Sequence, residues 1–249
     1  MNKKIFMYWA QGFKKAPAIV KHCTRRWINK NPTWDVVQLD ESNIKKYVDI
    51  DAFIPNLSNK KIGHAHRSDI IRLLLLIKYG GVWADGTTYC NKALDEWLPQ
   101  YESVGFFAYS GEIFNENPQY NMRPISNWFL YAEKDNMIAK KWLMAIKKYW
   151  KGRKKIGAYL AHHHQFGKCY IDDPSFKAKW DKVPKKSLRN PHALHPPSMK
   201  LPKKMKAQRK KSIDDEIVEM YKLSRHGNKK FMKKAGDITT VIGYLIARI

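Results

Sequence analysis

The segment AHRSDIIRLLLLIKYGGVWADGT, residues 65–87, decides the fold that we expect for this chain. Its first part, residues 65–79, is strongly apolar and predicts a helix. Gly80-Gly81 ends this helix, because glycine readily adopts the left-handed conformation found at helix C-termini. The apolar run Val82-Trp83-Ala84 then predicts a short central strand that ends at Asp85.

Strands and helices alternate on both sides of this segment. Upstream, an apolar run at residues 4–9 predicts a buried strand, and Pro17 lies where a helix would begin. The expected strands are 4–9, 34–39, 82–84, 104–109, 125–132 and 221–223, the expected helices are 17–31, 40–47, 65–79, 136–150, 156–166 and 213–220, and loops are expected at 49–62 and 110–124. The alternation predicts an α/β fold.

The composition is that of a globular protein with a sizeable core. The chain has 249 residues, of which 44% are hydrophobic, including 9 Trp, 13 Tyr and 10 Phe. This excludes a disordered basic tail and favours a single domain over residues 1–249. The wide separation of Cys23, Cys90 and Cys169 favours core thiols over a disulfide framework or a zinc knuckle. No apolar run is long enough for a membrane span or a signal peptide, so we expect a cytoplasmic protein.

The charge is strongly positive and unevenly distributed. Lys and Arg total 47 against 22 Asp and Glu, a formal net charge of +25. Residues 147–211 alone hold 20 basic and 3 acidic side chains, and their six prolines predict irregular loops between short helices. This stretch is either a solvated face or a surface for an anionic partner.

Two carboxylates stand out as candidates for chemistry. On a helix, Asp69 and Arg72 lie three residues apart and share a face, either as a functional pair or as a simple ion pair. Asp85 follows the apolar strand and precedes Gly86 and Thr87. It is therefore expected at the carboxyl end of a parallel strand, where open α/β sheets bind ligands.

Other clusters of polar residues favour structural roles. Successive side chains in His162-His163-His164 point about 100° apart on a helix and cannot all converge on one ion, even with His64 and His66 nearby. We expect one buried histidine and two that face solvent. Asp172-Asp173-Pro174 is typical of a helix cap. Neither a G-x-S-x-G motif nor a phosphate-binding glycine motif is present.

The segment around Asp85 resembles the signature of glycosyltransferase family 32, the DXD-containing sugar transferases, and of its capsular polysaccharide synthesis branch. Weaker motifs appear in the order typical of that family. They are Trp9-Ala10-Gln11-Gly12, Cys23 to Trp27, Asn31-Pro32 with Trp34, Ser126-Asn127-Trp128-Phe129, Tyr159 with His163 and Phe166, and Tyr221-Lys222-Leu223. The resemblance covers most of residues 1–180 and a short C-terminal motif.

The resemblance implies a GT-A fold, with a Rossmann-like sheet flanked by helices. Residues 1–132 would bind the nucleotide-sugar donor, and residues 133–249 would form a helical, basic, acceptor-side lobe with a C-terminal segment that closes over the donor. The implied site residues are Trp9 and Gln11 beside the base, Asp69 at the ribose or sugar hydroxyls, Arg72 beside the donor, Asp85 at the diphosphate, and Asn127, Trp128 and His163 on the acceptor side. Asp85 and Asp69 would be the catalytic pair.

The same resemblance implies a divalent cation, Mn²⁺ or Mg²⁺, between Asp85 and the diphosphate. Such oxygen ligands suit either ion, and the cation would offset the charge of the departing diphosphate. The third position of the D-x-D pattern is Thr87 here, so one carboxylate is replaced by a hydroxyl, which is a weaker ligand. Groups that could compensate are His163, His226 and Lys222, although Lys222 could equally be an ordinary surface lysine.

The implied function is a retaining glycosyltransferase that moves a sugar from a nucleotide-diphosphate donor, UDP-sugar foremost. The acceptor would be a capsular, lipopolysaccharide or other surface glycan, free or lipid-linked. The basic stretch 147–211 suggests an anionic membrane surface as a further partner. The rival hypothesis is a non-enzymatic nucleic-acid-binding protein, favoured by the charge and interleaved aromatic residues. We rank it lower, because it leaves Asp69, Arg72 and Asp85 without a role.

Overall fold

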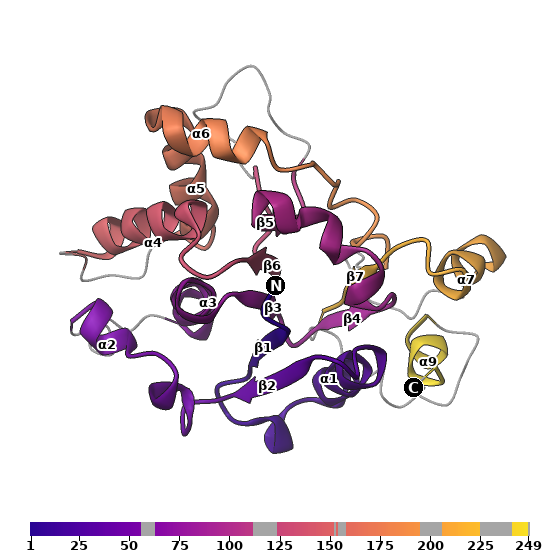
Figure 1. Ribbon diagram of the computed structural model, residues 1–249. Helices are drawn as coiled ribbons and strands as arrows, with labels where there is room; N and C mark the ends of the chain where they lie inside the picture. Colours follow the sequence, from indigo (N-terminus) through magenta and orange to yellow (C-terminus); the bar gives the residue numbers. More distant parts are fainter. Residues whose placement is uncertain are drawn as a thin grey trace.

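The computed structural model describes residues 1–55, 63–111, 124–151, 153, 158–194, 206–224 and 241–248. In this part of the chain a five-stranded sheet, in the order β2-β1-β3-β6-β5, forms the centre of the molecule (Figure 1). The strands are β1 Lys4–Tyr8, β2 Asp35–Leu39, β3 Gly81–Ala84, β4 Thr88–Cys90, β5 Phe106–Ala108, β6 Phe129–Ala132 and β7 Met220–Lys222. The helices are α1 Ala18–Lys30, α2 Ile50–Phe53, α3 His64–Tyr79, α4 Met137–Trp150, α5 Ala161–Asp172, α6 Pro174–Asp181, α7 Ala207–Asp214 and α9 Val241–Ile246, with 3₁₀ helices η1 Phe13–Lys15, η2 Ile44–Lys46, η4 Leu94–Glu96 and η5 Leu98–Val104.

The strand directions determine which residues gather at one edge of the sheet. Strand β1 is parallel to β2 and to β3, whereas β6 is antiparallel to β3 and to β5. The carboxyl ends of β1, β2 and β3 therefore lie together, and the residues that follow them meet at that edge. The expected α/β class, a Rossmann-like sheet flanked by helices, is confirmed.

Both faces of the central strands are buried, as the alternation of side chains along a strand requires. Phe6 and Trp83 face a core built with α3 and α4, whereas Ile5, Met7 and Val82 face a second core that includes Trp27 of α1. Figure 1 shows α3 and α4 on one side of the sheet and α1 on the other. Burial on both faces explains why these strands are continuously apolar.

The turn from α3 into β3 depends on two glycines. Gly80 and Gly81 have φ angles of 68° and 100°, which side chains rarely adopt. A Cβ on Gly80 would lie 2.7 Å from the Lys134 nitrogen, and one on Gly81 would lie 2.6 Å from the Lys4 oxygen. The pair thus allows a sharp reversal and a close approach of backbone, which directs β3 into the centre of the sheet.

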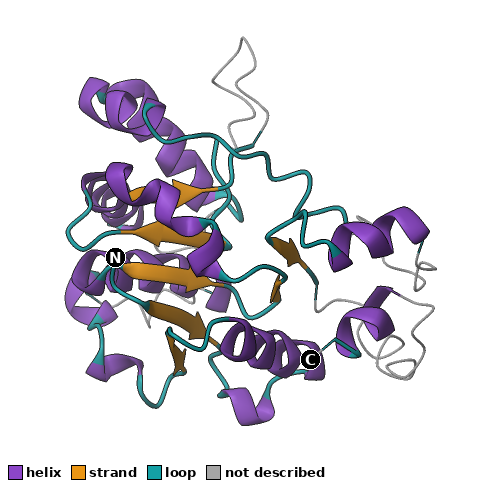
Figure 2. Ribbon diagram, turned by 45° about the vertical axis from the view of Figure 1, so that its right-hand side comes forward, coloured by secondary structure: helices purple, strands orange, loops and turns teal. Residues whose placement is uncertain are grey.

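A second, two-stranded sheet brings the C-terminal part of the chain beside the end of β3. Strands β4 and β7 are antiparallel, with Thr88 opposite Lys222 and Cys90 opposite Met220. Figure 2 shows this pair beyond the carboxyl ends of the central strands. A third core, which includes Cys23 of α1, joins this sheet to α1 and α9. Cys23 and Cys90 are free and buried and Cys169 is partly buried, consistent with core thiols.

Most expected elements are confirmed, and some boundaries are corrected. The strands at 4–9, 34–39, 82–84, 104–109 and 221–223 and the helices at 17–31, 65–79 and 136–150 agree within two residues. Other segments differ, because tertiary contacts or capping override the local pattern. The strand expected at 125–132 is limited to β6, and the helix expected at 40–47 is limited to the turn η2. The loop expected at 49–62 contains α2, which Asp49 caps, and the helix expected at 156–166 begins at Ala161 and continues to Asp172.

The helix expected at residues 213–220 is wrong. Helix α7 ends at Asp214, and Met220 already belongs to β7. Glu216 has a φ of 51°, which is incompatible with a continuing right-handed helix. Met220 instead pairs with Cys90 of β4.

The basic stretch 147–211 contains the end of α4, all of α5 and α6, and most of α7. Residues 152, 154–157 and 195–205 of it lie outside the described part of the chain, and an acceptor-side role for residues 133–249 stays a prediction. Among the described residues, no helix combines the length and apolar character needed to cross a bilayer.

Candidate active site

Asp85 lies directly after β3, at the edge where the parallel strands end. Its backbone nitrogen donates to the carbonyl of Trp128, 2.8 Å away, and its own carbonyl accepts from the nitrogen of Thr88 at 2.9 Å. The side chain remains 26% exposed. The backbone is therefore held from two sides while the carboxylate faces the edge of the sheet.

Two cations and an indole surround the Asp85 carboxylate. Arg72 Nη2 lies 3.2 Å from Oδ1, which also accepts from Trp83 Nε1 at 2.9 Å. Lys222 Nζ lies 2.8 Å from Oδ2 and donates to Thr87 Oγ1 at 3.0 Å. Burial by itself would raise the pKa of Asp85, but the charges of Lys222 and Arg72 outweigh it and lower the pKa. Asp85 is thus an ionised carboxylate at neutral pH.

Asp69 occupies the other side of the same guanidinium. Its Oδ1 lies 2.8 Å from Arg72 Nη1 and accepts from Asn127 Nδ2 at 2.9 Å. Ring nitrogens of His66 and His162 lie within 4 Å of the carboxylate. Asp69 and Arg72 form an ion pair, one of the two alternatives from the sequence, and Arg72 also contacts Asp85. Burial raises the pKa of Asp69, with Arg72 and His66 opposing the shift.

His162 completes this side of the site. Its Nδ1 lies 2.9 Å from Asn127 Nδ2, and its ring stacks on Trp142 at a centroid distance of 4.1 Å. Burial, followed by the charge of Arg72, holds the pKa of His162 well below its usual value, so the ring is neutral. Beside it is a small pocket, lined by His66, Asp69, Ile146, Tyr149, Trp150, Ala161, His162 and Gln165.

Trp9 and Gln11, the candidate residues after the first strand, lie at the same sheet edge as Asp85. Trp9 follows β1, and a Cβ added to Gly86 would lie 3.4 Å from Trp9 Cε3, so the indole packs beside the Asp85 turn. Gln11 Nε2 lies 3.4 Å from His64 Nε2 at the beginning of α3. Trp9, Gln11 and Asp85 therefore lie at one edge, although they come from different segments.

The acceptor-side residues divide into different roles. Asn127 connects Asp69 to His162, as described above. Trp128 is buried and stacks on Tyr109 at 5.1 Å, so its contribution to the site is the carbonyl that binds the Asp85 nitrogen. Of the three consecutive histidines, His162 is buried, His163 is partly buried and His164 is exposed. His162, which the sequence analysis did not select, contacts Asn127.

Sequence analysis also missed a second cluster at this edge. Glu41, which follows β2, pairs with Arg67 of α3 through Nε at 2.8 Å and Nη2 at 2.9 Å. Tyr8, at the end of β1, donates its hydroxyl hydrogen to Glu41. The signal was available, since Glu41 follows a parallel strand just as Asp85 does.

The donor set at Asp85 does not fit a divalent cation. Both oxygens of Asp85 already contact cationic groups, and Lys222 bridges Asp85 and Thr87, the two positions of the D-x-T motif. Within the described ranges, no group of three or more His, Cys, Asp or Glu side chains is placed to bind a metal ion. His226, the remaining predicted ligand, lies outside those ranges.

Comparison with known proteins gives two glycosyltransferase relatives. The O-glycosyltransferase braB of Annulohypoxylon truncatum is 26% identical over 175 residues, 65% of this chain and 41% of that protein. The glycosyltransferase afumC of Aspergillus fumigatus is 22% identical over 179 residues, 65% of this chain and 44% of that protein. The chain thus matches less than half the length of either relative.

A solved structure is also similar to this chain, and the profile of a protein family matches it. The structure of PaToxG Glycosyltransferase has a TM-score of 0.48 and 19% identity, with 86% of this chain and 83% of that one covered. The sequence profile of the capsular polysaccharide synthesis proteins matches residues 1–244. Since this match spans nearly the whole chain, the protein belongs to the capsular polysaccharide synthesis protein family.

Proposed function

We propose that this protein is a glycosyltransferase that uses a nucleotide-diphosphate sugar. The observation that carries the proposal is the pair of cations, Arg72 and Lys222, on Asp85 at the carboxyl edge of the sheet, with Trp9 beside it. Membership of the family and the glycosyltransferase names of both relatives support this activity. An aromatic ring beside two fixed cations suits a base joined to a diphosphate.

The donor would lie along this edge, with its base toward Trp9 and Gln11 and its diphosphate toward Arg72 and Lys222. Asp69 would accept hydrogen bonds from sugar hydroxyls. As the glycosidic bond breaks, its electron pair passes to the diphosphate oxygen, and the fixed cations stabilise the charge that develops there. Because these cations are already held by Asp85 and Asp69, little reorganisation is needed during the reaction.

The acceptor would enter from the side of Asn127 and His162. Its hydroxyl oxygen forms the new bond to the anomeric carbon, and its proton passes to the departing diphosphate. The family suggests attack on the same face of the sugar, which retains the anomeric configuration. A surface glycan, free or lipid-linked, is the acceptor class that the family name supports.

The test is a screen of nucleotide sugars for hydrolysis and for protection from thermal unfolding. UDP-sugars are the first members of the panel, followed by GDP- and dTDP-sugars. A donor that binds should raise the melting temperature by mass action. Stabilisation by oligonucleotides, with no response to any nucleotide sugar, would instead support the nucleic-acid-binding hypothesis.

The basic stretch 147–211 supports a second part of the proposal, reversible association with an anionic membrane that carries the acceptor. Each Lys or Arg near an anionic leaflet contributes roughly 1 kcal/mol, and the attraction fades within a Debye length. We expect sedimentation with phosphatidylglycerol vesicles at low salt and release at high salt. Equal binding to phosphatidylcholine vesicles, or none to either, would leave this stretch as a solvated face.

A further inference from the structure

We infer that the ammonium group of Lys222 takes the place of a divalent cation at the D-x-T motif, so that this protein binds its donor diphosphate without a metal ion. The inference rests on the proposed function, because it assumes a nucleoside diphosphate donor. It follows from the disagreement between the metal expected from the motif and the donor set present at Asp85.

The position of Lys222 is the first argument. Its Nζ lies 2.8 Å from Asp85 Oδ2 and 3.0 Å from Thr87 Oγ1, between the two groups that the motif would offer to a metal. A lysine ammonium carries three N–H donors, and these contacts use two of them. The third has no partner among the residues that the structure describes. In our inference this third N–H donates to a phosphate oxygen of the donor.

The backbone around Lys222 shows that this position is fixed by the fold. Lys222 lies in β7 opposite Thr88 of β4, and its nitrogen donates to the carbonyl of Pro191 at 2.9 Å. The next residue, Leu223, donates its nitrogen to the carbonyl of Thr87, also at 2.9 Å. The Lys222 side chain is only 16% exposed. It therefore differs from an exposed surface lysine, whose ammonium group samples many positions.

Each carboxylate oxygen of Asp85 already has a cationic partner. Asp69 and Asp85 are matched by Arg72 and Lys222, so these four side chains are close to neutral together. A divalent ion on Asp85 would lie next to two fixed cations, at a carboxylate whose two oxygens already contact them. A diphosphate would instead meet two cations with compatible hydrogen-bond donors.

Calorimetric titration with UDP, and in parallel with GDP, tests the inference. In EDTA the wild-type protein should bind one of them with a Kd within about twofold of the value in Mn²⁺. A twofold change in Kd is a small difference in binding free energy. Lys222→Met keeps most of the aliphatic stem and removes the charge. It should weaken binding in EDTA roughly 10- to 100-fold, as expected for loss of a charged hydrogen bond.

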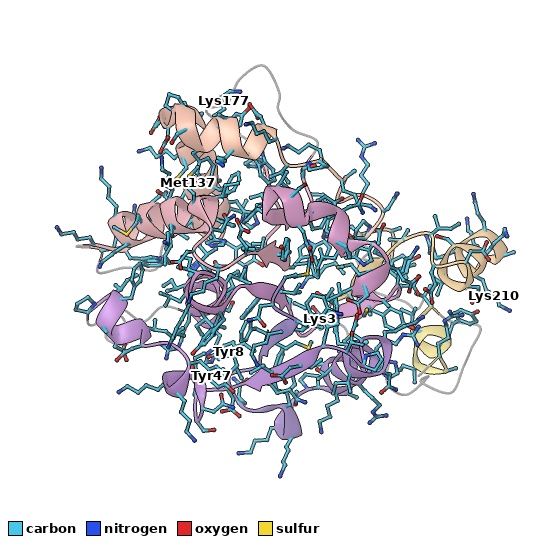
Figure 3. The ribbon with its side chains drawn as sticks, viewed as in Figure 1. Lys3, Tyr8, Tyr47, Met137, Lys177 and Lys210 are labelled. Carbon is cyan, nitrogen blue, oxygen red and sulfur yellow. The ribbon has the colours of Figure 1, made fainter. Side chains whose placement is uncertain are left out.

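Lys210→Met is the matched control, since Lys210 is an exposed lysine of α7 at the periphery of the molecule (Figure 3). It removes the same charge and should leave the Kd unchanged. Thermal unfolding of each variant separates lost binding from lost folding. If Lys222→Met does not fold, the wild-type titration in EDTA still tests the inference, because binding that requires Mn²⁺ would overturn it.

The outcomes separate this inference from the proposed function. Wild-type binding that appears only with Mn²⁺ would overturn the role of Lys222 and leave the glycosyltransferase proposal standing. Metal-free binding that is equal in wild type and folded Lys222→Met would overturn it as well. If neither nucleotide binds with or without Mn²⁺, and the panel of nucleotide sugars also fails, the proposed function and this inference are both wrong.

Discussion

Asp85 and Asp69 contact different nitrogens of the same Arg72 guanidinium, but their surroundings differ. Asp85 is partly exposed and contacts a second cation, Lys222, and its pKa is lowered. Asp69 is buried, its other close partner is the neutral amide of Asn127, and its pKa is raised. The contrast teaches that two carboxylates on one guanidinium can have pKa values shifted in opposite directions. Burial and the number of neighbouring cations decide the direction for each.

The largest effect is expected from Arg72→Met, which removes the shared cation and so leaves both Asp69 and Asp85 without their common partner. Loss of one partner from a buried charge network costs about 3–5 kcal/mol. Urea denaturation should report a loss of unfolding free energy in that range. Arg67→Met is the control, because Arg67 lies on the same helix but pairs with the more exposed Glu41; it should cost under about 1 kcal/mol. Equal losses would contradict the central position of Arg72.

The next effect is on turnover. Asp85→Asn keeps the shape of the side chain but removes the charge that holds Lys222 and Arg72 in place. We expect turnover to fall roughly 100-fold or more, as when a group that supports developing charge is lost. Asp35→Asn, an exposed aspartate at the opposite edge of the sheet, should leave turnover unchanged. Wild-type turnover in a folded Asp85→Asn protein would remove Asp85 from the mechanism.

A smaller effect concerns the connection from Asp69 to His162. Asn127→Ala removes one hydrogen-bond partner from each of these buried groups. The free energy of unfolding should fall by about 1–3 kcal/mol, because buried acceptors lose their partner. Combining it with Asp69→Ala should cost less than the sum of the two single changes, since both act on one contact. Strict additivity would show that Asn127 and Asp69 are independent.

The smallest effect is a change in pH dependence, measured on Asp69→Asn. The raised pKa of Asp69 means that the folded protein binds its proton more tightly than the unfolded chain does, so wild-type stability falls as pH rises above 3.8 toward that pKa. The asparagine variant lacks this loss, and its stability relative to wild type should increase over that range. His66, His162, Arg72 and Asp85 face Asp69 in both proteins, so their titration largely cancels in the difference. A difference independent of pH would contradict the raised pKa.

The sequence by itself determined the local parts of this protein. The apolar run at residues 65–79, ended by Gly80-Gly81, predicts α3, because a helix and its termination depend on neighbouring residues. The spacing of Asp69 and Arg72 predicts their pairing for the same reason. The position of Asp85 at the site edge follows from a strand that ends at Ala84. The α/β class follows from the alternation of such elements.

Only the tertiary structure decided which distant residues complete the site. Lys222 is 137 residues from Asp85 in the sequence and reaches it through the pairing of β4 with β7. In that pairing Met220, which was expected in a helix, lies opposite Cys90 of β4. His162 contacts Asn127, whereas the sequence analysis had selected the neighbouring His163. Glu41 contacts Arg67 because β2, β1 and α3 are adjacent in the fold. Sheet order and strand register depend on packing over the whole chain, so local sequence periodicity does not predict them.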